Sequence, residues 1–255
     1  MDHDEILRYE ELQHNAFPAL RTVMYDGWAI RFGGNFTYRV NDANPMYAST
    51  LPVQEKVAYA EELYRGSGLE KAIFKIHEGM APEEAQLLDS VLEARGYEKD
   101  RHGRIQVCPL QDFQLWPNAP QTTIEPFMSD RWLEGFLTMN GTPEEQKAAA
   151  KEMLSSIVYP IAAASVWEDG EMIACGLGVL ERGYVGLYDI YVDANHRRQG
   201  LGQDICSAIM QAGKARGCHT AYLQCLTSNT GARAMYARMG YEETYAYWFR
   251  LKRFK

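Results

Sequence analysis

The chain has 255 residues, enough for one large domain or two small ones, and 46% of them are hydrophobic, so a sizeable core can form. Its formal net charge of −8 argues against a nucleic-acid partner, because binding to a phosphate backbone needs a basic face. Net charge does not exclude an anion site in a single loop.

No targeting segment, membrane span or metal site is expected. The start, MDHDEILRYE, is acidic and no apolar stretch follows it, and the longest apolar run, YPIAAASVW, is too short to span a bilayer. The five cysteines form no C-x-x-C pair and the six histidines are scattered, which argues against a disulfide framework and against zinc. These features favour a cytoplasmic enzyme with buried thiols.

In the first half, residue periodicity predicts alternating helices and strands. Helices are predicted over residues 6–17, 53–68 and 81–98. Strands are predicted over residues 22–33, 35–43, 71–79 and 103–110, with Gly33-Gly34 as the turn between the first two. Residues 111–123 then break all periodicity, and the prolines at 117 and 120 place a domain boundary near residue 120.

The second half shows a similar alternation. Helices are predicted over residues 142–157, 199–217 and 229–240, and strands over 161–169, 170–182, 184–193, 219–228 and 241–252. LEARGYEKD at 92–100 echoes YARMGYEET at 236–244, a weak sign that the halves are related modules. We therefore predict an α/β protein of the α+β type with a mixed sheet, divided into domains 1–120 and 121–255.

The segment VDANHRRQGLG, residues 192–202, joins a predicted strand to a predicted helix. Unpaired N–H groups at a helix start, glycines that allow close approach and two forked arginine donors together suit a diphosphate. A solvated basic turn that only begins the helix explains the same residues. The sequence lacks a nucleotide P-loop, a G-x-G-x-x-G, a G-x-S-x-G and an H-E-x-x-H motif.

The strand, loop and helix LYDIYVDANHRRQGLGQDI resemble the core of the GNAT superfamily of N-acetyltransferases. Arg197, Gly200 and Gly202 fill the family's loop pattern [QR]-x-x-G-x-[GA], and SNTGARAMYARMGYEE resembles its second signature, an Asn before a helix that carries a Tyr. The resemblance covers residues 160–248. It implies acetyl-CoA as the acetyl donor and two GNAT-like modules as the fold.

The resemblance also implies a role for individual residues. The loop would hold the pyrophosphate of CoA, the strand Ile190 to Val192 would pair with the pantetheine arm and supply an oxyanion donor, and Asn229 would contact the CoA arm. Tyr236 would be the general acid that protonates the departing thiolate, and a packed core tyrosine is the alternative. The expected CoA-binding residues are Ile190, Tyr191, Val192, Arg197, Arg198, Gln199, Gly200, Leu201, Gly202, Gln203 and Asn229.

The general base is less well defined by the resemblance. Many members carry a Glu earlier on this strand, where this chain has Gly186. Asp189 is the alternative, since a carboxylate in an apolar strand is costly without a partner, and it resembles an Asp that meets cationic amines in some members. An Asp that bonds to a neighbouring loop, or a water relay as base, explains the sequence too. Asp189 and the net acidity suggest a cationic acceptor.

The remaining candidate residues are a possible cysteine nucleophile and the aromatic residues of the first half. Cys225 has no adjacent histidine and is expected to pack in the core, so transfer through a ternary complex is predicted in place of an acyl-cysteine. The first half resembles the amino-terminal module of a subgroup with two GNAT-like modules, but it lacks the loop motif and has Leu92 in place of the tyrosine. We therefore expect a degenerate, non-catalytic copy. Its strand aromatics are candidates for an acceptor pocket or, alternatively, for core: Trp28, Phe32, Phe36 and Tyr38.

Together these features predict an acetyl-CoA-dependent N-acetyltransferase, acting on a primary amine of a small molecule and needing no metal, membrane or nucleic acid. Two alternatives stay open. One is a CoA-binding sensor or regulatory module without turnover. The other is a protein N-acetyltransferase, which would need an open peptide groove.

Overall fold

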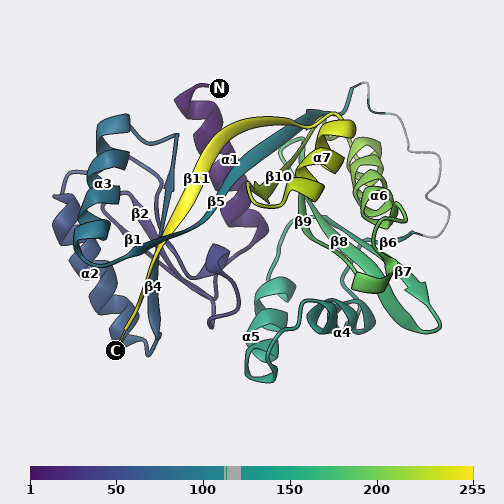
Figure 1. Cartoon of the computed structure of the whole chain (residues 1–255), viewed down its shortest axis with the longest axis horizontal. Helices are drawn as coiled ribbons and strands as arrows, with labels where there is room; N and C mark the ends of the chain where they lie inside the picture. Colours follow the sequence, from purple (N-terminus) through teal and green to yellow (C-terminus); the bar gives the residue numbers. More distant parts are fainter. Residues whose placement is uncertain (112, 114–121, 255) are drawn as a thin grey trace.

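The computed structural model describes residues 1–111, 113 and 122–254, in which helices and strands alternate around one sheet (Figure 1). The α-helices are α1 (His3–Ala16), α2 (Val53–Gly66), α3 (Pro82–Ala94), α4 (Asp130–Met139), α5 (Glu144–Ser155), α6 (Leu201–Ala215) and α7 (Thr230–Arg238). The strands are β1 (Arg21–Tyr25), β2 (Trp28–Phe32), β3 (Ala43–Pro45), β4 (Lys71–His77), β5 (Glu98–Pro109), β6 (Thr123–Glu125), β7 (Ile161–Glu168), β8 (Glu171–Glu181), β9 (Tyr184–Val192), β10 (Thr220–Leu226) and β11 (Glu242–Arg253). Two short 3₁₀ helices are η1 (Tyr38–Val40) and η2 (Ala194–His196).

The eleven described strands form one sheet in the order β1-β2-β3-β4-β11-β5-β10-β9-β8-β7-β6. Pairs β3–β4 and β9–β10 are parallel, and the other described pairs are antiparallel. The predicted mixed α/β fold is therefore confirmed. The predicted boundary at residue 120 lies outside the described residues.

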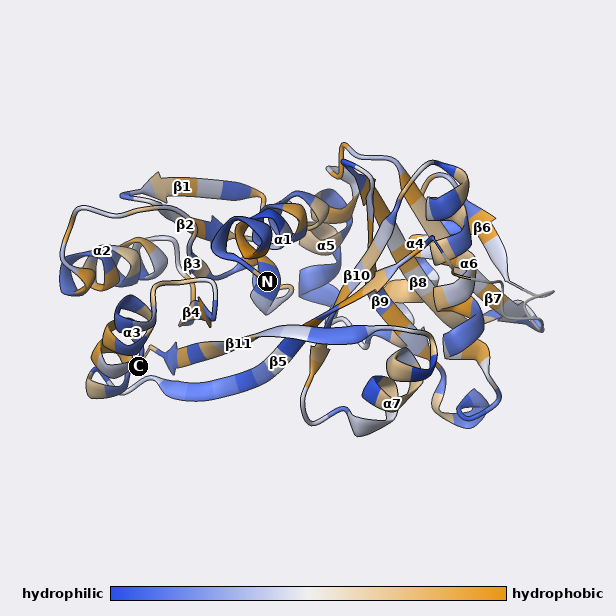
Figure 2. Cartoon of the chain, turned by 90° about the horizontal axis from the view of Figure 1, so that it is seen from above, coloured by the Kyte–Doolittle hydropathy of each residue, from blue (hydrophilic) through white to orange (hydrophobic). Residues whose placement is uncertain are grey.

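Two long strands, β5 and β11, join the halves of the molecule. They pair with each other, and they run side by side from the first half into the second (Figure 2). The first half of β11 pairs only with β5, whereas residues 247–253 also pair with β4, so the last strand of the chain completes the sheet of the first half. The C-terminus accordingly lies beside the first-half elements (Figure 1).

Three hydrophobic clusters fill the faces of this sheet. One lies under α2 and α3 in the first half and contains Trp28 and Phe74. A second lies under α1, α4 and α5, and a third lies under α6 and α7. Consecutive residues of β10 divide between the last two, Tyr222 in the second and Leu223 in the third, because successive side chains of a strand point to opposite faces.

The first half departs from the predicted strands at two places. The single strand expected over residues 22–33 is the hairpin β1–β2, which turns at Asp26 and Gly27 with φ of +42° and +80°, as an Asp-Gly turn allows. The strand expected over 35–43 is mostly η1 and loop, because the Asn41 side chain accepts the N–H of Gly33 at 2.8 Å and folds the segment back.

Helix α4 was not predicted, although its sequence contains the signals. The side chain of Ser129 accepts the N–H of Trp132 as an N-cap, and the buried residues recur at helical spacing. Those buried residues are Trp132, Leu133, Phe136 and Leu137. The short strand β6 was not predicted either.

Candidate active site at the gap between β9 and β10

The two parallel strands of the second half separate along their length. Their pairing ends at Leu187 opposite Leu223. Beyond that point β9 continues with β8 as far as Val192, and β10 continues with β5 as far as Leu226. The facing edges of β9 and β10 therefore form a wedge whose backbone groups have no ladder partners across it. Ile190 to Val192, the segment expected to pair with the pantetheine arm, lies on this edge.

The loop that follows β9 is held in place by its own side chains. The Asp193 carboxylate accepts the Asn195 N–H at 2.9 Å and lies 2.8 Å from His196 Nδ1, while His196 Nε2 lies 2.9 Å from the Glu168 carboxylate on β7. These two carboxylates raise the pKa of His196. The loop is thus fixed to the sheet at the point where it turns toward α6.

The backbone requires a glycine at position 200 of the loop, whereas local packing does not require one at position 202. Gly200 is the N-cap of α6 with φ +91°, a conformation that favours glycine, and Arg198 before it also has a positive φ of +64°. A Cβ on Gly202 would only touch Met235 and Val192 at 3.5 Å, so the protein's own packing does not require a glycine there.

The other residues expected to bind CoA lie at the N-termini of α6 and α7. Residues 197–200 are exposed at the N-terminus of the 15-residue helix α6, where free N–H groups face solvent. Leu201 packs on the third cluster, and Gln203 is buried with no partner for Nε2 among the described residues. Asn229 caps α7 by accepting the Ala232 N–H at 3.2 Å, a local role that the sequence reading did not assign.

Tyr236 lies on the α6–α7 face of the sheet. Its side chain packs in the third cluster, with its ring 5.6 Å from that of Tyr241, and its hydroxyl interacts with the Cys206 thiol. Burial raises the pKa of Tyr236 well above its ordinary value. The phenol is therefore protonated at neutral pH and has a proton to donate.

Asp189 reaches the opposite face through a β-bulge. Between the pairs Leu177–Tyr188 and Cys175–Tyr191, two residues of β9 face one of β8, and Asp189 has φ +51°. Strict alternation would put Asp189 on the face of Leu187, under α6. The extra residue reverses the phase, so Asp189 and Tyr191 share the face of Tyr188.

The Asp189 carboxylate has a partner that the sequence did not reveal. Arg39 Nη2 lies 2.7 Å from Asp189 Oδ1, and the side chains are 26% and 7% exposed. The Arg39 guanidinium also lies 4.2 Å from the centre of the Phe17 ring. Asp189 Oδ2 has no hydrogen-bond partner among the described residues. Arg39 and Asp189 are 150 positions apart in the sequence, so no local signal marks this pair.

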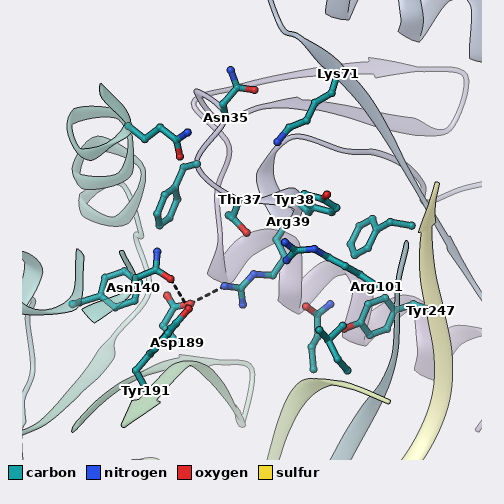
Figure 3. A pocket seen from close by; sticks show the side chains of 16 residues that line it. Asn35, Thr37, Tyr38, Arg39, Lys71, Arg101, Asn140, Asp189, Tyr191 and Tyr247 are labelled. Atoms are coloured by element: carbon teal, nitrogen blue, oxygen red, sulfur yellow. Dashed lines mark hydrogen bonds and ion pairs between the residues drawn. The ribbon is translucent and has the colours of Figure 1, made fainter. Parts of the chain in front are cut away.

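A cavity of about 460 Å³ opens at the wedge, on the face of Asp189. Its walls come from both halves of the chain, as Figure 3 shows. Asp189 and Tyr191 of β9 and Gln224 and Leu226 of β10 form the wedge side. The other lining residues are Asn35, Phe36, Thr37, Tyr38, Arg39, Lys71, Arg101, Phe136, Asn140, Gln146, Tyr247 and Phe249.

Of the four first-half aromatic residues expected in either an acceptor pocket or the core, two line the cavity and two lie in the core. Phe36 and Tyr38 line the cavity. Trp28 and Phe32 are buried in the first-half core. The division follows the backbone, because Phe36 and Tyr38 belong to the loop and η1 that replace the expected strand.

Two alternatives for the chemistry can be assessed from packing. A Cβ on Gly186 would lie 2.6 Å from the side chains of Tyr188 and Tyr222, whose hydroxyls are 2.8 Å apart, so this packing excludes a Glu at position 186. Cys225 is buried in the third cluster, and burial raises the pKa of its thiol to about 11. A thiol with that pKa is a poor nucleophile at neutral pH.

The second half of the chain matches a known protein family. Residues 127–241 match the Acetyltransferase (GNAT) family. This part of the chain belongs to the GNAT acetyltransferase family. The whole chain is 23% identical over 253 residues to YobR, an uncharacterised N-acetyltransferase of Bacillus subtilis, covering 98% of this chain and 100% of YobR.

Solved structures extend the likeness in fold to the first half. A GCN5-related N-acetyltransferase from Kribbella flavida has a TM-score of 0.71 at 18% identity, covering 96% of this chain and 95% of that one. A tandem GNAT protein from the clavulanic acid biosynthesis pathway has a TM-score of 0.67 at 13% identity, covering 96% and 87%. The predicted family and the predicted pair of GNAT-like modules are confirmed.

Two features are absent from the described residues. No helix there is long and apolar enough to cross a membrane. Across the same residues, no three His, Cys, Asp or Glu side chains gather closely enough to hold a metal ion.

Proposed function

We propose that this GNAT protein transfers the acetyl group of acetyl-CoA to an amine of a small molecule that binds in the cavity at Asp189. The observation that carries the proposal is Asp189, whose side chain lines a cavity that reaches the β9–β10 wedge and whose buried Oδ2 has no hydrogen-bond partner among the described residues. A carboxylate oxygen that is nearly buried and accepts no hydrogen bond is an unfavourable arrangement unless a ligand supplies the donor.

The wedge and the loop suit CoA in their chemistry. The unpaired edge of β9 offers backbone groups to an amide-containing arm, and the N-terminus of α6 with Arg197 and Arg198 offers donors and positive charge to a diphosphate. CoA would supply the acetyl group as a thioester there. These are the residues that we propose hold it.

Donor and acceptor would approach the wedge from opposite faces. Tyr236 packs in the cluster under α6 and α7, whereas Asp189, Tyr191 and Tyr247 line the cavity on the other face. Such an arrangement supports direct transfer in a ternary complex. Parallel double-reciprocal lines in two-substrate kinetics would contradict it.

The proposed reaction begins with the loss of a proton from the acceptor amine. Asp189 Oδ2 accepts a proton from the bound ammonium, directly or through water, and the neutral amine attacks the thioester carbonyl carbon. An N–C bond forms, and a backbone N–H of β9 stabilises the oxyanion, a type of contact typically worth about 3 kcal/mol. The C–S bond then breaks, Tyr236 donates its proton to the thiolate, and the proton lost by the amide nitrogen restores the phenol.

The experiment is a screen for thiol release from acetyl-CoA over a panel of amines, with mass spectrometry of the acetylated product. Acetyl transfer to at least one small amine is the expected result. Tight acetyl-CoA binding with no release for any amine would favour a regulatory module instead. Acetylation of lysines or N-termini of peptides only would favour a protein acetyltransferase.

A further inference from the structure

The charges that line the cavity are mostly positive. Arg39, Lys71 and Arg101 face one carboxylate, Asp189, which already pairs with Arg39. Lys71 and Arg101 therefore remain without a carboxylate of the cavity to balance them. All three cations come from the first half, and Figure 3 shows Arg39 beside Asp189, with Lys71 and Arg101 farther along the same cavity.

Lys71 and Arg101 lie over the same ring. Lys71 Nζ is 5.3 Å and Arg101 Cζ is 3.9 Å from the centre of Tyr38. No carboxylate of the described residues lies within ion-pair distance of Lys71 Nζ. The nearest to Arg101 is Asp100, at 4.0 Å, and Asp100 also accepts the Tyr38 hydroxyl at 3.0 Å.

The lysine is electrostatically unfavourable in this position. Burial, Arg253 and Arg101 lower the pKa of Lys71, and only Glu70 opposes them. Two cations held over one ring, one of them half-buried, repel each other. An anion in the cavity that contacts both groups would offset that repulsion and supply acceptors for their N–H groups.

This inference rests on the proposed function and specifies its acceptor. We propose that the acceptor is a bifunctional small molecule whose amine lies at Asp189 and whose oxyanion group, a carboxylate or a phosphate, binds Lys71 and Arg101. A cavity of about 460 Å³ suits a small molecule with both groups, since ligand pockets usually have 300–1,000 Å³. Because Arg39 already balances the charge of Asp189, we propose an acceptor that carries an anionic group besides its ammonium, in place of a purely cationic one.

The degenerate first half would then determine specificity. It supplies the cations of the acceptor pocket, and the second half supplies the wedge, the loop and Asp189. The net charge of −8 does not predict this, because the chain's acidic residues lie mostly elsewhere.

The test compares amines that differ only in their second group. One set is β-alanine, O-phosphoethanolamine, β-alaninamide, ethanolamine and 1,3-diaminopropane, and a larger set is glucosamine with glucosamine 6-phosphate. Acetyl-CoA turnover with an anionic member should exceed that with its neutral or cationic counterpart in kcat/KM by about tenfold or more, the size expected for hydrogen bonds to a charged group. Comparing kcat/KM for β-alanine with that for O-phosphoethanolamine shows whether the site takes a carboxylate or a phosphate.

Variants locate the anion in the cavity. Lys71→Gln should raise KM for the anionic member by about tenfold and leave kcat/KM for its neutral counterpart within about twofold. Lys99→Gln removes the same charge from β5, outside the cavity, and should change neither. Stabilisation by the anionic amine in a thermal shift assay, lost in Lys71→Gln, reports binding independently of turnover.

The outcomes separate the inference from the proposed function. Preference for neutral or cationic members, or an equal response of both substrates to Lys71→Gln, overturns the anionic acceptor while acetyl transfer stands. Absence of thiol release with every amine overturns the proposed function. Under that result, stabilisation by anionic amines that depends on Lys71 would still support the anion site, and its absence would overturn it.

Discussion

Replacing Asp189 with Asn tests the centre of the proposed site. Asn tolerates the positive φ of +51° as well as Asp does, so the bulge should keep its shape. The substitution removes one charge from a pair 2.7 Å apart, whose carboxylate side chain is 7% exposed. It also replaces the free Oδ2 with an NH₂ group or an amide oxygen, neither of which can accept the amine's proton.

The expected magnitudes differ for stability and for rate. Breaking a buried ion pair costs about 3–5 kcal/mol, but Arg39 is 26% exposed and can still donate to an amide oxygen, so the free energy of unfolding should fall by about 1–3 kcal/mol. Loss of a proton acceptor should lower kcat by about 10²- to 10⁴-fold. That corresponds to about 3–5 kcal/mol in the activation barrier.

The assay combines steady-state kinetics, using the best amine from the screen, with urea unfolding of the same preparations. Asp42→Asn is the matched control, since Asp42 is a buried carboxylate of the first half that does not line the cavity. It should change unfolding and leave kcat near the wild-type value. If Asp189→Asn destabilises the fold yet keeps kcat within about threefold of wild type, well short of the effect of a lost base, Asp189 is only a structural ion-pair partner.

Three further predictions concern the CoA side of the wedge. Tyr236→Phe should lower kcat by about 10²-fold if the phenol protonates the thiolate. Tyr241→Phe, at the neighbouring ring, is the control, and equal rates for the two variants would remove Tyr236 from the mechanism. Gly202→Asp should abolish CoA binding in calorimetry, whereas Gly66→Asp, the same change at an uncrowded helical glycine, should not; retained affinity would place the phosphates elsewhere. His196 has a raised pKa in the folded state, so its ion pairs stabilise the protein fully below about pH 6.5 and are lost as the pH rises through the raised value. The difference in Tm between wild type and His196→Gln should therefore be largest in mild acid and vanish in alkali, and a constant difference would refute this.

Local sequence was sufficient for most elements of the second half. Three consecutive strands, the helix after RRQGLG and the helix after Asn229 all follow from short-range periodicity and glycine placement. The resemblance to the GNAT superfamily could be found from sequence for the same reason, because the loop motif and the segment around Tyr236 are each contiguous. The hairpin at Asp26-Gly27 and helix α4 also carry local signals, an Asp-Gly turn and a serine N-cap before apolar residues at helical spacing.

The acceptor side of the site depended on the tertiary structure. Sequence reasoning selected Asp189, but strict alternation would place its side chain under α6, and only the bulge opposite Gly176 turns it into the cavity. Arg39, Lys71 and Arg101 reach the same cavity from η1, β4 and β5, because β5 and β11 hold the first half against the second. Periodicity and motifs report interactions between near neighbours in sequence. A phase change in a strand and an ion pair across 150 residues depend on which surfaces pack together, and only the assembled sheet decides that.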